Sequence, residues 1–168
     1  ILIGLVGSEM CIRDRVYMNH LKSYNELKKV NVNSIIDIIN FSSSYKQKYI
    51  HYFSTVNIFS GNSPHNLYSE DTPINSEIHY NSSGYAASKW VAEGLLINAR
   101  TSGIKCNIYR LPIILPARDD PVHPKEQWFN SLFYLIKKLK SFPKELENFT
   151  MPYALVDELA EFVVLISK

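Results

Sequence analysis

A tyrosine and a lysine stand four positions apart, at Tyr85 and Lys89, in a stretch with helical composition. On a helix this spacing places both side chains on one face, one turn apart. A phenol with an ordinary pKa of about 10 is a poor proton donor at neutral pH. A neighbouring ammonium lowers that pKa toward the range in which acid–base catalysis is effective. Thr55 follows an apolar run and brings a hydroxyl to the end of a predicted strand, where α/β sheets bind ligands.

The elements that must hold these groups can be predicted from hydrophobic spacing and from Gly, Pro and Ser residues. Helical spacing and short β-branched or aromatic runs predict helices at 24–41, 85–101, 127–139 and 156–166, and strands at 49–53 and 106–111. Ser82 or Ser83 can cap the helix that carries Tyr85, and Gly103 can end it. Residues 60–83, rich in Ser, Asn, Pro and Gly, predict a long surface loop. This order of elements is typical of an α/β domain with a parallel sheet.

The first fifteen residues do not match the rest of the fold. Gly4 and Gly7 follow an apolar stretch and suggest a dinucleotide-binding loop, but no amphipathic helix follows them, as that motif requires. The segment also lacks the basic start of a signal peptide. Residues 4–15, GLVGSEMCIRDR, resemble the translated read-through of a sequencing adaptor. We therefore expect residues 1–15 to be non-native and the natural sequence to start near Val16, after its own N-terminus has been cut off.

Composition and charge argue against several other classes of protein. A formal net charge of +2 gives no reason to expect nucleic acid or an anionic membrane as a partner. No apolar run approaches the about 20 residues that span a bilayer. The five histidines are scattered without the spacing of a zinc site, so we expect no metal. Cys11 and Cys106 show no paired spacing, which favours a reducing, cytoplasmic location.

Tyrosine and lysine occur at this spacing by chance in many helices, as an exposed pair without a role, so the surrounding motifs decide. The run Tyr52-Phe53-Ser54-Thr55-Val56 precedes the pair, Gly84-Tyr85-Ala86-Ala87-Ser88-Lys89-Trp90-Val91-Ala92-Glu93 frames it, and Ile108-Tyr109-Arg110-Leu111-Pro112 follows it. This set resembles the extended short-chain dehydrogenase/reductase family and, within it, the thioester reductases. That branch includes carboxylic acid reductases and the terminal reductase domains of nonribosomal peptide and polyketide synthases.

Two further patterns of this family extend the resemblance over about residues 16–168. The family pattern NH-x-x-x-Y-x-x-L-x-x-x-N-V is matched by Asn19, His20, Tyr24, Leu27, Asn31 and Val32. Val156-Asp157 matches its V-D at the start of a helix. The most specific element is Ser88-Lys89-Trp90-Val91-Ala92-Glu93.

The resemblance implies a role for each matching residue. Thr55 would donate a hydrogen bond to the substrate carbonyl, Tyr85 would donate a proton to it, and Lys89 would hold the nicotinamide ribose and lower the pKa of Tyr85. The residues beside the cofactor would be Ser54, Leu111, Pro112 and Ile113. Asn31 would brace the neighbouring helix, with a purely local hydrogen bond as the alternative.

The sequence departs from the family in two places. It reads Arg110-Leu111-Pro112-Ile113-Ile114 where the family has R-P-G-x-I, which affects the backbone path beside the nicotinamide. The glycine-rich phosphate loop and the first strands have no counterpart. The resemblance therefore implies the C-terminal part of a Rossmann-like parallel-sheet NAD(P)-binding domain, without the first βαβ units. It favours NADPH as cofactor, with NADH as the alternative.

The function implied is the NAD(P)H-dependent reduction of an acyl thioester on a carrier protein or CoA to an aldehyde, with the alcohol as the product of a second reduction. The 168-residue chain by itself is expected to be inactive. Two alternatives keep the fold: a fatty-acyl-CoA reductase, and a nucleotide-sugar epimerase or dehydratase. A third is a non-catalytic binding module on a decayed reductase scaffold, against which the intact set of Thr55, Tyr85 and Lys89 argues.

Overall fold

The computed structural model describes residues 22–44, 46–59, 68–72, 74, 83–119, 128–144, 147–148 and 150–166. The predictions for residues 1–15 and for Asn19 and His20 lie outside the described residues. The chain forms two compact units, residues 1–110 and 111–168, and each is described by itself.

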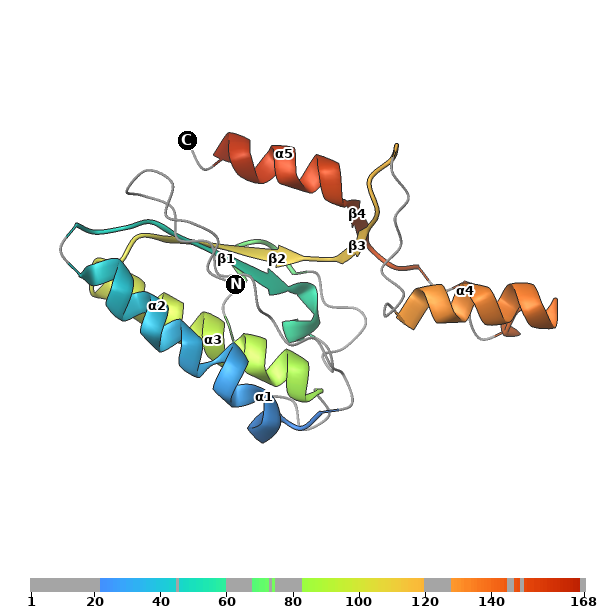
Figure 1. The fold of residues 1–168 in the computed structure, drawn as a ribbon, viewed down its shortest axis with the longest axis horizontal. Helices are drawn as coiled ribbons and strands as arrows, with labels where there is room; N and C mark the ends of the chain where they lie inside the picture. Colours follow the sequence, from blue (N-terminus) through green and yellow to red (C-terminus); the bar gives the residue numbers. More distant parts are fainter. Residues whose placement is uncertain are drawn as a thin grey trace. The chain divides into compact units, whose positions relative to one another are not determined.

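Among the described residues, six helices and strands belong to the first unit and four to the second (Figure 1). The last element of the first unit, β2, ends one residue beyond the boundary. The first unit holds α1 (Tyr24–Asn31), α2 (Asn33–Ser43), β1 (Ile50–Thr55), η1 (Val56–Phe59), α3 (Gly84–Thr101) and β2 (Cys106–Leu111). The second unit holds β3 (Ile113–Leu115), α4 (Trp128–Leu139), β4 (Tyr153–Leu155) and α5 (Val156–Ile166). The order of helices and strands is that of an α/β fold.

The single helix predicted over 24–41 is wrong at Val32, where the chain turns and separates α1 from α2. Leu27, Val32 and Ile35 are all buried. On one straight helix Val32 would point about 140° away from Leu27, because each residue turns the helix by about 100°. The break at Val32 allows both side chains to be buried.

The predicted helix over 85–101 is confirmed as α3, together with both of its predicted ends. The Ser83 hydroxyl accepts a hydrogen bond from the Ala86 N–H at 3.2 Å, which caps the first turn. Gly103 follows the last turn with a φ of 90°, a left-handed conformation that glycine adopts without steric cost. The caps fix the length of the helix that carries Tyr85 and Lys89.

Strands β1 and β2 form a two-stranded sheet, and their arrows point the same way in Figure 1. Helices α1, α2 and α3 all lie on one side of this sheet (Figure 1). The core between the sheet and the helices consists of Ile35, Ile50, Tyr52, Ala92, Leu96 and Cys106. The predicted strand 49–53 is confirmed with a shift toward its C-terminus, and the predicted strand 106–111 is confirmed as β2.

The opposite face of the sheet carries stacked rings. The centroids of Tyr49 and His51 lie 5.0 Å apart, and Tyr109 stacks on His51 at 5.9 Å and on Phe53 at 5.4 Å. Because side chains alternate along a strand, these residues point away from the core that contains Ile50 and Tyr52. The alternation decides which β1 residues can face α3.

Residues 68–72 lie within the loop predicted over 60–83 and form a turn. The Thr72 N–H donates to the Ser69 carbonyl at 3.1 Å, and the Ser69 N–H donates to the Thr72 hydroxyl at 2.8 Å. Apart from this turn, Ile74 and Ser83, the predicted loop lies outside the described residues.

The second unit is built on a parallel pair of three-residue strands that the sequence does not predict. In this pair Ile113 lies opposite Tyr153 and Leu115 lies opposite Leu155. The predicted helices 127–139 and 156–166 are confirmed as α4 and α5. No helix among the described residues is long and apolar enough to cross a membrane.

Candidate active site

Two hydroxyls lie at the end of β1, where the strand passes directly into the short helix η1. The Thr55 hydroxyl accepts a hydrogen bond from the Asn57 N–H at 3.2 Å. The Ser54 hydroxyl is buried and has no hydrogen-bond partner among the described residues. Ser54 lies two positions after Tyr52, so both side chains point to the sheet face that α3 covers. A buried hydroxyl without a partner is costly, and this makes Ser54 the natural acceptor or donor for a bound group.

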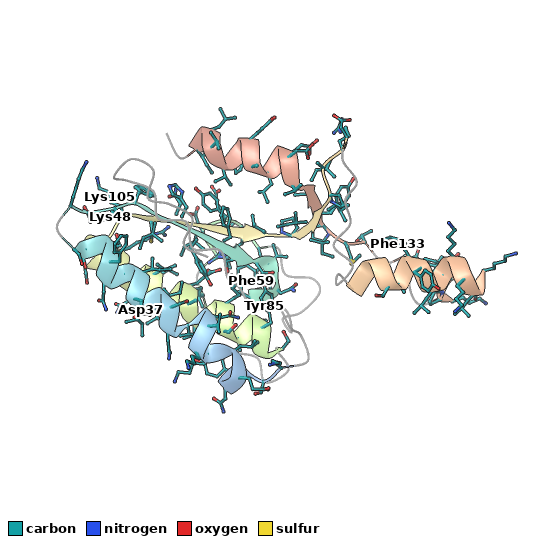
Figure 2. All side chains as sticks on the ribbon, in the orientation of Figure 1. Asp37, Lys48, Phe59, Tyr85, Lys105 and Phe133 are labelled. Carbon is teal, nitrogen blue, oxygen red and sulfur yellow. The ribbon has the colours of Figure 1, made fainter. Side chains whose placement is uncertain are left out.

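Tyr85 and Lys89 both lie on α3, as predicted, and both are buried: Tyr85 is 7% exposed and Lys89 is 2% exposed. The Lys89 ammonium donates a hydrogen bond to the Phe53 carbonyl at 2.6 Å and lies 4.7 Å from the centroid of the Tyr52 ring. Tyr85 is labelled on α3 in Figure 2, and α3 packs against both η1 and β1. The helix that carries the pair therefore lies against the strand end that carries Thr55.

Burial sets the protonation behaviour of the pair. It lowers the pKa of Lys89 to about 8, and the nearby Glu93 carboxylate raises it in part. Burial also raises the pKa of Tyr85. The lowering of the Tyr85 pKa that the sequence predicts is thus not seen in the chain alone, because loss of solvent on burial opposes the phenolate.

A fully buried carboxylate lies one turn beyond Lys89. Glu93 Oε2 accepts a hydrogen bond from Nε of Arg110 at 3.1 Å and forms an ion pair with its Nη2, also at 3.1 Å. Its other oxygen, Oε1, and the Tyr52 hydroxyl are buried without a hydrogen-bond partner among the described residues. Burial raises the pKa of Tyr52, and the nearby Glu93 and Tyr85 raise it further. The sequence alone indicated no role for Glu93 and Arg110, although both lie in the motifs quoted above.

A chain of hydrogen bonds links α1 to the first turn of α3. The Asn31 amide donates to the Ser88 hydroxyl at 2.9 Å, and that hydroxyl donates to the Tyr85 carbonyl at 2.8 Å. All three residues are buried. The predicted brace by Asn31 is therefore confirmed, and Ser88, for which the sequence indicated no role of its own, is its point of attachment.

Gly84 explains how α1 and α3 approach so closely beside Tyr85. A Cβ atom at position 84 would lie 2.3 Å from the Lys22 carbonyl oxygen and 2.6 Å from the Tyr24 nitrogen. Real Cβ contacts are never so short, and backbone atoms cannot swing aside as a side chain would. The residue before Tyr85 must therefore be glycine for this packing.

Of the residues predicted beside the cofactor, Leu111 ends β2, and Pro112 and Ile113 follow at the start of the second unit. Their assignment stays a prediction. Among the described residues no three His, Cys, Asp or Glu side chains group closely enough to bind a metal ion.

Comparison with known proteins decides the family. Residues 17–161 match the family described as male sterility protein. The chain belongs to this family, the thioester-reductase branch of the short-chain dehydrogenase/reductases. Among curated relatives it is 40% identical, over 96 residues, to a linear gramicidin synthase of Brevibacillus parabrevis. That match covers 55% of this chain and 2% of the relative.

Solved structures of reductase domains show the same fold. The terminal R domain of the myxalamid PKS-NRPS biosynthetic pathway superposes with a TM-score of 0.80 at 22% identity, over 90% of this chain and 37% of that domain. The thiolation–reductase di-domain of an archaeal non-ribosomal peptide synthetase gives 0.79 at 21% identity, over 92% and 34%. The fold is thus the Rossmann-like α/β fold of these reductases. This member of the male sterility protein family spans about a third of the solved reductase structures that it matches.

Proposed function

We propose that this chain is the catalytic part of a reductase that converts an acyl thioester on a carrier protein to an aldehyde. The observation that carries the proposal is the buried Tyr85–Lys89 pair on α3, packed against the end of β1 in a chain of the male sterility protein family. A tyrosine and a lysine on one helix face, and a threonine hydroxyl at the end of the strand on which that helix packs, are the kinds of group that carbonyl reduction uses. The acyl carrier rather than CoA is favoured because relatives include peptide and polyketide synthases and a thiolation–reductase di-domain.

The residues fit the nicotinamide cofactor that the family implies. The ammonium of Lys89 has three N–H bonds and gives one to the Phe53 carbonyl, so it keeps donors for a ribose hydroxyl. The Ser54 hydroxyl, which has no partner among the described residues, is a further group that a bound molecule can satisfy. Lys89 and Ser54 would hold the nicotinamide end of NADPH, or of NADH, which supplies hydride when bound. The assignment of Leu111, Pro112 and Ile113 beside the cofactor rests on the family resemblance alone.

The chain's own groups would then act on the substrate oxygen. Thr55 would donate a hydrogen bond to the thioester carbonyl, and Tyr85 would hydrogen-bond the same oxygen as negative charge develops on it. Proton transfer from Tyr85 would give a hemithioacetal, whose C–S bond then breaks to release the carrier thiol and the aldehyde. The raised pKa of Tyr85 keeps the phenol protonated, which suits a proton donor, and the Lys89 charge would favour its ionisation once the proton is transferred.

The substitution Tyr85→Phe in a complete reductase that contains residues 16–168 tests the proposal. We expect aldehyde formation to fall by about 10²- to 10⁴-fold, the usual contribution of a general acid, with nearly unchanged cofactor affinity. Lys89→Ala should reduce both rate and cofactor affinity, because the same ammonium would bind the nicotinamide ribose and assist the ionisation of Tyr85. Tyr153→Phe is the control, since Tyr153 is 65% exposed on β4. Unchanged activity in Tyr85→Phe would rule out the proposed proton donor.

The carrier is tested with the same acyl group presented in two ways. Aldehyde formation from the carrier-bound thioester should exceed that from the CoA thioester. Equal or faster reduction of the CoA thioester would instead identify a fatty-acyl-CoA reductase, and turnover of a nucleotide sugar alone would identify a sugar epimerase or dehydratase.

A further inference from the structure

Arg110, near the end of β2, joins three parts of the first unit. Its Nε and Nη2 bind Glu93 on α3, each at 3.1 Å. Its Nη1 donates to the Thr72 carbonyl at 3.1 Å and to the Glu70 carbonyl at 3.4 Å. The guanidinium carbon lies 5.0 Å from the ring centroid of Phe59. One side chain therefore contacts the helix, the 68–72 turn and η1.

The ion pair between Arg110 and Glu93 lies largely in the interior and is not a surface ion pair. The Glu93 side chain is 0% exposed and that of Arg110 is 16% exposed. A buried carboxylate requires a partner, and one edge of the planar arginine fork meets Oε2 of Glu93 while Nη1 reaches other acceptors. Phe59 also stacks on Tyr68 at 4.3 Å, so a second contact holds the start of the same segment.

The position of the segment in the chain gives the contact its significance. Residues 68–72 lie in the connection that leaves β1 after Thr55 and enters α3 at Gly84, next to Tyr85. Glu93, in turn, lies one helical turn beyond Lys89. Arg110 thus ties the middle of this connection to the helix that carries the proposed proton donor.

We propose that Arg110 is a positioning residue, which holds segment 68–72 against α3 through Glu93 and so fixes the connection between Thr55 and Tyr85. Arg110 contacts Glu93 and the carbonyls of Glu70 and Thr72, and it acts on the site through segment 68–72. The anchoring follows from the contacts alone, whereas its effect on substrate binding rests on the proposed reductase function.

The anchoring can be measured in the 168-residue chain by amide hydrogen exchange. Arg110→Lys keeps the charge, but an ammonium cannot bind Glu93 and the two carbonyls in the same planar geometry. We expect the Ser69 and Thr72 amides to exchange about tenfold faster, the effect of losing about one charge-assisted hydrogen bond. The amides in the middle of α3 should change less than twofold.

Arg100→Lys is the matched control, because Arg100 also joins α3 to β2 but at the far end. Its Nε and Nη2 donate to the Cys106 carbonyl at 3.0 and 2.6 Å. It should leave exchange at Ser69 and Thr72 unchanged. If Arg110→Lys does not fold, Glu93→Gln takes its place, since glutamine keeps an acceptor for Arg110 without the charge. Unchanged exchange at residues 69 and 72 in the folded variant would overturn the anchoring.

The effect on the reaction is measured in the complete reductase. Arg110→Lys should raise KM for the acyl thioester about tenfold and change kcat less than threefold, because substrate contacts shift while the proton donor stays in place. A purely structural role would lower the active fraction, and hence apparent kcat, with KM unchanged; that result would overturn positioning. Failure of the proposed function would appear separately, as full activity in Tyr85→Phe.

Discussion

Both units of the chain contain helices, but the helices differ in how much of their surface is buried. Every buried residue among those described belongs to the first unit. In the second unit α5 has no buried residue, and large apolar side chains are exposed on both α4 and α5: Phe133, Tyr134, Leu135, Leu139, Phe162, Val164, Leu165 and Ile166. An amphipathic sequence pattern therefore predicts helices in both units. Among the described residues, only the helices of the first unit contribute buried side chains to a core.

The charged groups of the two units differ in the same way. The ion pair of the first unit, Glu93 with Arg110, is buried, whereas Arg118 and Glu158 of the second unit are 71% and 58% exposed at a separation of 2.5 Å. Exposed pairs contribute about 0–1 kcal/mol, and breaking a buried one costs about 3–5 kcal/mol. Most of the stability of the described residues thus resides between the β1–β2 sheet and its three helices.

The largest effect should come from truncating the core of the first unit. Leu96 is 0% exposed and belongs to the sheet–helix core. Leu96→Ala should lower the free energy of unfolding, measured in urea, toward the upper end of the range of about 2–5 kcal/mol for such cavities. Leu165→Ala is the matched change in the second unit, where Leu165 is 67% exposed. It should cost less than about 0.5 kcal/mol; equal losses would contradict the comparison.

A smaller effect concerns the buried lysine and its dependence on pH. The pKa of Lys89 is about 8 in the folded chain, against an ordinary value of 10.5. Between these values the unfolded chain binds more protons. Stability should therefore rise with pH from about 8 to about 10.5, by up to about 3 kcal/mol in all, and this contribution should be lost as pH falls to 8.

The measurement is the free energy of unfolding of wild type minus that of Lys89→Met, followed across this window. Burial raises the pKa of Tyr52 and Tyr85, which acts in the opposite direction above about pH 10. Both tyrosines remain in the variant, so their contribution cancels in the difference. Leu96→Ala removes no ionisable group and should keep the wild-type slope. A flat difference would show that Lys89 is not buried as described.

The smallest effect separates two glycines of α3. Gly84→Ala places a Cβ against backbone atoms of residues 22–24 and should destabilise by about 1–3 kcal/mol, as overpacking does. A Cβ atom added at Gly94 would have no other atom within 4 Å. Gly94→Ala should therefore stabilise by about 0.5–1 kcal/mol through helix propensity alone. Thermal melts of both variants check the prediction, and a stabilised Gly84→Ala would contradict the close approach of α1.

Elements with strong local determinants could be predicted from the sequence. α3 has Ser83 before it and Gly103 after it, and its ends were predicted to within one residue. The short strands β3 and β4 could not be predicted, because three residues are too few to show a period. Their pairing joins Ile113 to Tyr153, so it depends on contacts between segments far apart in the chain.

The placement of Tyr85 and Lys89 on one helix could be predicted, but their electrostatics could not. Tyr85 and Lys89 follow from a spacing of four, which the helix alone determines. The partners of Lys89, the Phe53 carbonyl and Glu93, depend on how α3 packs on β1. The direction of the Tyr85 pKa shift depends on the same packing, since burial raises it.

The close contact at Gly84 has a consequence for how such chains can diverge. If a descendant acquires a side chain at this position, the backbone at Lys22 and Ser23 must change shape in the same lineage. Otherwise the packing of α1 beside Tyr85 is lost. The two segments are distant in the gene, but a change in one is acceptable only with a change in the other. They should therefore be inherited, and exchanged by recombination, as a single module.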